Sequence, residues 1–131
     1  METIIVAAAV IIRDGRVLLT QRTESSHLAL RWEFPGGKVE KDESPSGALA
    51  RELAEELGVE AFVGEPFAFN WHDYGDKRVL LLTYLTRVEG TPRLLACRDM
   101  GWFDAPAVAR LHLPEADAPI VARLIPLLSG R

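Results

Sequence analysis

The chain has few of the features that mark extracellular or membrane proteins. Its single cysteine, Cys97, cannot form an internal disulfide and suits a reducing cytosol, so we expect a cytoplasmic protein. The apolar stretch at residues 4–12 is too short to span a bilayer, lacks a basic leader, and ends at Arg13-Asp14-Gly15. We therefore expect no membrane partner and interpret the stretch as a core strand.

Runs of positive charge are also missing. The formal net charge is −4, and no basic cluster resembles those that bind nucleic acid polymers, so we expect no such partner. An acidic protein can still bind a small polyanion where a metal ion supplies positive charge. Repeats, low-complexity segments and linkers are absent as well. The 131 residues, 48% of them hydrophobic, therefore predict a single domain over 1–131 with its own core.

Periodicity and turn residues predict one α/β unit. Asp14-Gly15 is a favoured two-residue hairpin turn, and residues 74–76 form a second turn. The predicted strands are 3–13, 16–22, 32–34, 59–73, 77–88 and 101–104, and the predicted helices are 46–57, 106–110 and 116–128. Polar loops cover 23–31 and 90–100. The last helix is expected to be interrupted at Pro119 or to begin there.

The helix at 46–57 has clear end signals and two distinct faces. Ser44-Pro45-Ser46 offers a cap and a proline for the first turn, and Gly58 offers a left-handed stop. At about 100° per residue, one face is apolar and the opposite face is acidic. The apolar face comprises Leu49, Ala50, Leu53, Ala54 and Leu57. The acidic face comprises Glu52, Glu55 and Glu56.

These carboxylates belong to a longer spacing pattern that begins in a Gly-Gly loop. Residues 37–59 read Gly-x5-Glu-x7-Arg-Glu-Leu-x-Glu-Glu-x-Gly-Val. Carboxylates three and four apart are neighbours on a helix and repel each other unless a cation lies between them. Mg²⁺ and Mn²⁺ prefer oxygen ligands, and Mg²⁺ commonly combines one or two carboxylates with substrate phosphates. The pattern therefore favours a divalent-cation site beside a phosphate chain over a merely solvated acidic face.

The segment matches the Nudix box without a substitution, so the chain resembles a Nudix hydrolase. Residues 32–40 and 113–119 resemble the flanking segments of MutT-type enzymes and of the related CTP pyrophosphohydrolases. The resemblance covers nearly the whole chain, including the Asp14-Gly15 hairpin. It implies the Nudix α/β/α sandwich, in which a mixed β-sheet lies between helices.

The resemblance also implies an activity. We expect Mg²⁺-dependent (or Mn²⁺-dependent) hydrolysis of a (deoxy)nucleoside triphosphate to a monophosphate and pyrophosphate. A MutT-like role would be the removal of oxidised nucleotides such as 8-oxo-dGTP, which protects DNA. Phosphoryl transfer of this kind depends mainly on positioning and charge neutralisation.

Roles follow for the residues that match the box. Glu52, Glu55 and Glu56 are predicted metal ligands or water activators, and the carbonyl of Gly36 is a further predicted ligand. Two more residues are predicted supports: Arg51 can reach Glu55 on the helix and can pair with Glu43 in the preceding loop.

Substrate contacts are predicted at both ends of a nucleotide. Gly37, Lys38 and Arg22 are candidate phosphate contacts; a solvated lysine and a cross-strand ion pair are the competing interpretations for the two cations. Around the base, Phe34, Leu30 and His27 are candidate pocket residues.

One position departs from the relatives. MutT-type and CTP-type enzymes carry a Glu, as metal ligand or base, in the loop before the strand that contains Trp102. This chain has Ala96 there, and Asp99 is either a substitute or a turn residue. The general base is then Glu55 or Glu56.

The base-contacting position of the tail holds Asp117, where the MutT-type pattern has Asn. An amide donates to O6 of 8-oxoguanine and accepts from its N7–H, whereas an ionised Asp only accepts and suits N4 of cytosine. A protonated Asp would restore the donor, and burial can raise the pKa sufficiently. The competing interpretation is a helix N-cap.

Three functions stay open at this stage. The first is the 8-oxo-dGTP-type enzyme; the second is the same chemistry on CTP, dCTP or a modified pyrimidine triphosphate. The third is a non-catalytic Nudix module that binds nucleotides. A monomer and a homodimer are both compatible with the sequence.

Overall fold

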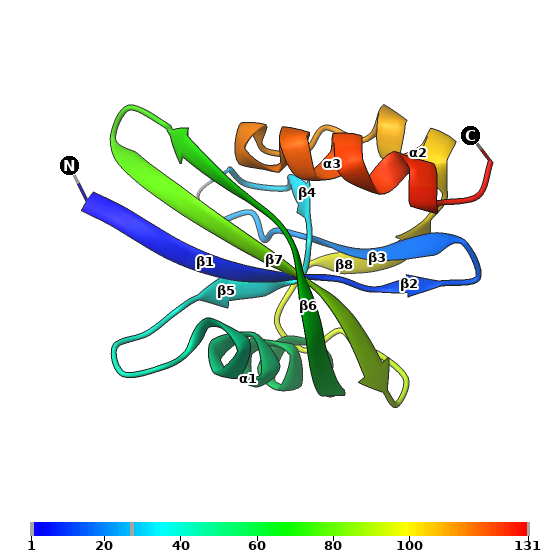
Figure 1. The fold of residues 1–131 in the computed structure, drawn as a ribbon, viewed down its shortest axis with the longest axis horizontal. Helices are drawn as coiled ribbons and strands as arrows, with labels where there is room; N and C mark the ends of the chain where they lie inside the picture. Colours follow the sequence, from blue (N-terminus) through cyan, green and yellow to red (C-terminus); the bar gives the residue numbers. More distant parts are fainter. Residues whose placement is uncertain (1, 27, 131) are drawn as a thin grey trace.

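The computed structural model describes residues 2–26 and 28–130. Layers of strands lie between helix α1 (Pro45–Leu57) on one side and helices α2 (Ala105–Arg110) and α3 (Ala118–Leu124) on the other (Figure 1). The expected α/β/α sandwich with mixed strand directions is confirmed. No helix in the described part of the chain is both long and apolar enough to cross a membrane.

The first sheet has the strand order β5-β1-β7-β6. Its strands are β5 (Gly36–Lys38), β1 (Glu2–Val10), β7 (Lys77–Glu89) and β6 (Glu60–Asp73). Strand β1 runs parallel to β7, and the other pairs are antiparallel. Ala7 and Ala9 pack with the α1 side, while Ala8 and Val10 pack with the α3 side. Burial on both faces explains why β1 is almost continuously apolar.

The second sheet contains β2 (Ile12–Arg13), β3 (Arg16–Gln21), β4 (Trp32–Glu33) and β8 (Asp99–Phe103). The predicted single strand 3–13 was wrong, because the chain passes from one sheet to the other at Ile11. Strand β8 begins two residues before the predicted start, since its pairing with β3 extends to Asp99. Strand β5 was not predicted, because two glycines give it no strand pattern.

Helix α1 begins and ends at the expected signals. The Ser44 hydroxyl accepts a hydrogen bond from the Gly47 N–H at 3.1 Å, and Gly58 is left-handed with φ +65°. Its buried side chains are Ala48, Leu49, Leu53 and Leu57. The prediction that Ala54 belongs to the apolar face was wrong, because α1 turns that position away from the sheet and Ala48 is buried instead.

The C-terminal helix is shorter than predicted. Helix α3 starts at Ala118 with Pro119 in its first turn, which confirms that boundary. The predicted helix 116–128 is divided instead into η1 (Glu115–Asp117), α3 and η2 (Ile125–Leu127). Pro126 has no backbone N–H, so it cannot extend the α-helical hydrogen-bond ladder.

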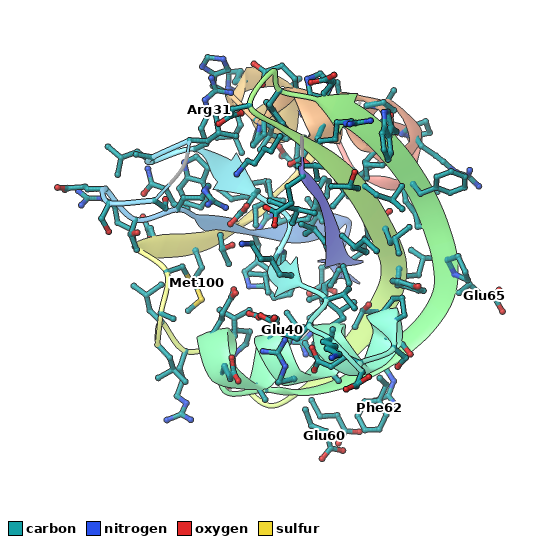
Figure 2. The ribbon with its side chains drawn as sticks, turned by 90° about the vertical axis from the view of Figure 1, so that its left-hand side faces the viewer. Arg31, Glu40, Glu60, Phe62, Glu65 and Met100 are labelled. Carbon is teal, nitrogen blue, oxygen red and sulfur yellow. The ribbon has the colours of Figure 1, made fainter. Side chains whose placement is uncertain are left out.

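The core has two parts, one on each side of the first sheet. Leu49, Leu53 and Leu57 of α1 pack in one part, and Ile120 and Leu124 of α3 pack in the other. Strand β6 is an edge strand, and Figure 2 shows its Phe62 and Glu65 pointing away from the body of the molecule. The candidate site is a cavity lined by residues of β1, β5, β7, α1 and the segment before α3.

Candidate active site

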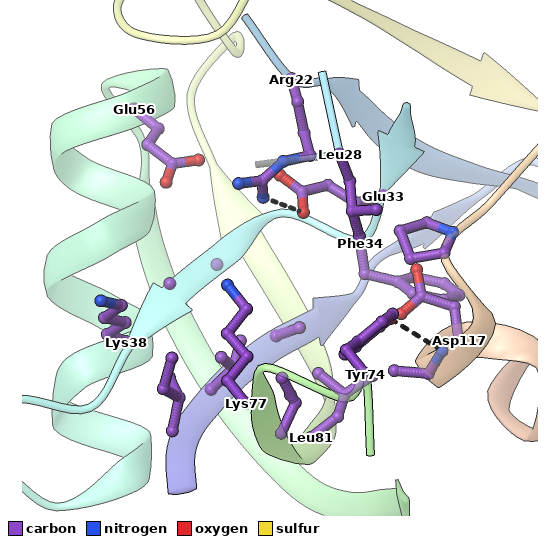
Figure 3. A pocket seen from close by; sticks show the side chains of 18 residues that line it. Arg22, Leu28, Glu33, Phe34, Lys38, Glu56, Tyr74, Lys77, Leu81 and Asp117 are labelled. Carbon is purple, nitrogen blue, oxygen red and sulfur yellow. Dashed lines mark hydrogen bonds and ion pairs between the residues drawn. The ribbon is translucent and has the colours of Figure 1, made fainter. Parts of the chain in front are cut away.

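A cavity of about 320 Å³ runs from helix α1 to the segment before α3. Glu56, Gly37 and Lys38 line one end, and Tyr74 and Asp117 line the other (Figure 3). The volume is in the usual range for a small-molecule site. The cavity therefore joins the acidic helix to the predicted base-contacting residue.

The glycine loop brings the backbone of β5 against α1 and β1. Gly36 has φ +154°, and a Cβ there would overlap the carbonyl oxygen of Ala7. A Cβ at Gly37 would overlap the carboxyl group of Glu52. Glycine at position 36 therefore lets β5 approach β1, and glycine at position 37 lets Glu52 lie against the strand.

Arg51 organises the loop and the acidic face of α1. Its guanidinium donates to both carboxylate oxygens of Glu43, at 2.7 and 2.8 Å, and to the carbonyl of Lys38 at 3.3 Å. It also donates to Glu52 at 3.0 Å and to Glu55 at 3.3 Å. Hydrogen bonds from Arg51 and from the backbone of Glu40 lower the pKa of Glu43 to about 2. The expected Arg51–Glu43 and Arg51–Glu55 pairs are present.

Glu52 and Glu56 form an electrostatically unfavourable pair. Burial raises the pKa of Glu56 far above its ordinary value, and the hydrogen bond and charge of Glu52 raise it further. Two carboxyl groups held together in this way are stabilised by a proton or by a cation between them. The donor set, two carboxylates beside the glycine loop, fits Mg²⁺ or Mn²⁺.

Glu55 does not join this pair. Its side chain is 59% exposed against 17% for Glu52, and it pairs with Arg51 outside the cavity. Among residues 2–26 and 28–130, no three His, Cys, Asp or Glu side chains are gathered as metal ligands. Arg51 Nη1 instead donates to both Glu52 and Glu55, so its guanidinium lies between these two carboxylates, and the metal-ligand role of Glu55 stays a prediction.

Arg22 and Glu33 form a charged pair in the middle of the cavity wall. Arg22 Nη1 lies 2.8 Å from Glu33 Oε1, and both residues line the cavity. Burial raises the pKa of Glu33, and Arg22 opposes the rise. The predicted cross-strand ion pair of Arg22 is present, and the arginine still faces the site. Glu33 was not predicted, although it directly precedes Phe34, a predicted pocket residue.

Asp117 lies at the far end, 6% exposed. Burial and the nearby charge of Glu33 raise the pKa of Asp117 to about 8, while Arg22 opposes the rise. Its Oδ2 atom is buried without a hydrogen-bond partner. Asp117 occupies the N-cap position of α3, as the competing interpretation expected, but its side chain makes no cap hydrogen bond. A neutral carboxyl group with a free polar atom faces the cavity.

The remaining pocket predictions are partly met. Phe34, as predicted, is buried and lines the cavity. Leu30 is 42% exposed and lies outside the cavity, whereas Leu28, which was not predicted, lines it. His27 lies outside the described residues. Tyr74 and Lys77 also line the cavity and were missed, because their hairpin approaches the glycine loop only in the folded chain.

The loop before β8 closes the C-terminal end of α1. The N–H groups of Arg93 and Leu95 donate to the carbonyls of Leu57 and Glu56, at 2.8 and 3.0 Å. Asp99 is exposed, and its carboxylate accepts from the N–H of Met100 at 2.8 Å. Asp99 is the first residue of β8 rather than a turn residue, and it does not line the cavity where a substitute for the relatives' Glu would be needed.

Comparison with known proteins agrees with this fold and site. A model of the NUDIX domain family matches residues 3–125. The chain therefore belongs to the Nudix family and is a hydrolase of that family.

Its relatives cover its whole length. It is 39% identical over 132 residues to the CTP pyrophosphohydrolase of Escherichia coli (strain K12), covering 100% of this chain and 98% of that protein. It is 37% identical over 127 residues to the 8-oxo-dGTP diphosphatase of Haemophilus influenzae, covering 95% and 93%. The solution structure of the E. coli ORF135 protein matches with a TM-score of 0.82 at 38% identity, covering 97% of this chain and 91% of that one.

Proposed function

We propose that the protein is a Mg²⁺-dependent pyrophosphohydrolase of (deoxy)nucleoside triphosphates, with 8-oxo-dGTP as the first candidate substrate. One observation carries the proposal: a single cavity has carboxylates and cations at one end and, at the other, Asp117 with a raised pKa and an Oδ2 atom without a hydrogen-bond partner. The charged end of the cavity suits a triphosphate, and the end with Asp117 suits a base. The names of the relatives support the same class of substrate.

At the phosphate end, Glu52, Glu56 and the carbonyl of Gly36 would hold the metal. Bound there, the ion would polarise the phosphate and lower the pKa of the attacking water. Lys38, Lys77 and Arg22 line the same stretch of the cavity and would neutralise the triphosphate. Glu43 and Arg51 would keep the glycine loop against α1.

Glu56 would accept the proton of the attacking water. The relatives' loop carboxylate is replaced by Ala96, and Asp99 lies outside the cavity, so neither supplies a base. Glu55 is paired with Arg51 and exposed. Glu56 is a buried carboxyl group that lines the phosphate end of the cavity. Attack of water at phosphorus and departure of pyrophosphate would leave the nucleoside monophosphate.

At the base end, a neutral Asp117 would be able to bind 8-oxoguanine. Its O–H would donate to O6 of 8-oxoguanine, and its carbonyl oxygen would accept from N7–H. An unoxidised guanine presents an acceptor at N7, so it would lose the second bond. The repulsion expected from an ionised Asp117 does not arise while burial keeps the carboxyl group protonated.

The second candidate substrate class is CTP, dCTP or a modified pyrimidine triphosphate. The same neutral carboxyl group would accept from N4–H of cytosine and donate to N3. The identity of 39% with a CTP pyrophosphohydrolase favours this alternative.

Pyrophosphate release with Mg²⁺ tests these proposals. The panel is 8-oxo-dGTP, dGTP, CTP, dCTP, 5-methyl-dCTP and 5-hydroxy-dCTP, and the Glu56→Gln variant is the control. We expect 8-oxo-dGTP to be hydrolysed at least about tenfold more efficiently than dGTP, the approximate value of one discriminating hydrogen bond. A preference for the cytosine nucleotides would select the second class. Binding of nucleotides with no turnover in the parent would instead indicate a non-catalytic module.

A further inference from the structure

The segment that carries Asp117 is held from across the cavity. Tyr74 Oη accepts a hydrogen bond from the N–H of Ala116 at 3.1 Å, and Asn70 Nδ2 donates to the carbonyl of Ala116 at 2.9 Å. Both backbone polar groups of this buried residue are thus bound by side chains of the β6–β7 hairpin. Figure 3 shows the bond between the tyrosine and the segment just before Asp117.

Tyr74 is itself firmly placed at the tip of the hairpin. Its N–H donates to the carbonyl of Lys77 at 2.9 Å, and the ring of His72 packs edge-on against its ring with centroids 4.5 Å apart. The turn is completed by Gly75, whose φ of +96° favours glycine and whose N–H donates to Asp73 Oδ1 at 2.8 Å. The hydroxyl therefore lies at a defined point over the cavity.

Asp117 has little else to hold its side chain. The carboxyl group makes no cap bond, and Oδ2 has no partner. Its position in the cavity is set by the backbone, through the N–H bond to Pro114 at 2.9 Å and through the neighbouring Ala116. Arg31 adds only longer contacts to this segment, 3.3 Å to the carbonyl of Leu113 and 3.7 Å to Glu115.

We propose that Tyr74 and Asn70 are positioning residues that set base specificity, because together they clamp Ala116 and so place the carboxyl group of Asp117. This inference rests on the proposed nucleotide hydrolysis. The clamp acts at the base end, away from Glu56 and the glycine loop. Loosening the clamp weakens nucleotide binding and reduces the discrimination between bases, without changing the chemical step.

The experiment compares Tyr74→Phe with Tyr84→Phe. The chain has two tyrosines, and Tyr84 lies on β7 outside this cavity, so its variant is a matched loss of one hydroxyl. Phe at position 74 keeps the ring and leaves the N–H of Ala116 without its acceptor. We expect KM for the preferred nucleotide to rise about three- to tenfold, and kcat to stay within about twofold. The kcat/KM ratio between preferred and disfavoured nucleotides should fall by a similar factor.

Asn70→Ala is the second variant and should show the same separation of KM from kcat, while Tyr84→Phe should match the parent. The proposal is overturned if both hairpin variants keep the parent's KM and substrate ratio, or if kcat falls as much as KM rises. A parent that hydrolyses no nucleotide overturns the proposed function instead. In that case amide hydrogen exchange at Ala116 of the ligand-free protein tests whether Tyr74 holds this segment. Faster exchange in Tyr74→Phe supports the clamp, and unchanged exchange overturns it.

Discussion

Asp117 shows how burial and a neighbouring charge change the chemistry of a side chain. Exposed, an aspartate is ionised at neutral pH and only accepts hydrogen bonds. In this cavity burial and Glu33 raise the pKa of Asp117 from 3.8 to about 8, so the group is mostly protonated at pH 7. The fold favours the protonated form. Its contribution to stability is therefore complete below about pH 4 and is lost as the pH rises through 8.

We predict that base recognition weakens as Asp117 ionises. Between pH 7 and pH 9 the protonated fraction of a group with a pKa of about 8 falls by about tenfold, and KM for 8-oxo-dGTP should rise by about that factor. Asp117→Asn keeps a donor and an acceptor but does not titrate, so its KM should stay flat. Steady-state kinetics across this pH range measure both. An equal rise in the Asn variant would rule out Asp117 as the source.

Glu55 and Glu56 are adjacent in the sequence but have different surroundings. Glu56 is buried at the cavity wall, whereas Glu55 is exposed and paired with Arg51. We predict that Glu56→Gln lowers kcat by about 10²–10⁴-fold, the usual effect of removing a catalytic acid or base. The matched Glu55→Gln should stay within about threefold, because an exposed ion pair contributes little. Comparable losses in the two variants would contradict the assignment.

At the scale of elements, strand β5 and helix α1 form the phosphate end together. The strand contributes the backbone of two glycines, Gly36 and Gly37, and the helix contributes Glu52 against it. Arg51 joins the two through the Lys38 carbonyl and Glu43. The spacing between the glycine loop and the helix is therefore a structural requirement of the site.

We predict that Gly37→Ala lowers kcat by about 10- to 100-fold, because the new Cβ would displace the Glu52 carboxyl group. The φ of Gly37 is not in the left-handed region, so the backbone tolerates alanine. Lys41→Ala, which removes an exposed side chain from the same loop, is the control and should keep the parent's kcat. Thermal unfolding would check that both variants fold. An active Gly37→Ala enzyme would show that Glu52 does not need this close approach.

At the scale of the whole molecule, the cavity lies where several layers meet. Strand β1 brings β5 and β7 together, and the hairpin tip of β6 and β7 reaches η1. Glu52 and Glu56 oppose each other at the phosphate end, and this opposition contributes to the raised pKa of Glu56. A divalent cation should therefore bind the folded state and stabilise it.

We predict that 10 mM Mg²⁺ raises the Tm by a few degrees, as expected for a ligand present at about ten times its Kd. NaCl at equal ionic strength should not reproduce the rise, and EDTA should reverse it. Glu56→Gln should lose most of it. Differential scanning calorimetry would measure these shifts, and a full Mg²⁺ response in the Gln variant would place the cation elsewhere.

Much of the phosphate end could be predicted from the amino-acid sequence. The helix limits at Ser44 and Gly58, the Arg51 pairs and the glycine loop depend on residues close in sequence, and helical spacing decides which of them meet. One detail was not predicted: Arg51 also donates to Glu52, so its guanidinium joins Glu52 and Glu55. The base end was harder to predict, because Glu33 lies far in the sequence from Tyr74 and Asn70 and these residues meet only through folding.

The family, the acidic helix with its caps, and the place of both ends of the proposed site along the chain follow from the amino-acid sequence. These depend on local periodicity and on an uninterrupted motif. The folding of distant segments places Glu56 at the cavity, raises the pKa of Asp117, and brings Tyr74 and Asn70 to Ala116. Burial and long-range contacts depend on the packing of distant segments, and no local pattern encodes that packing.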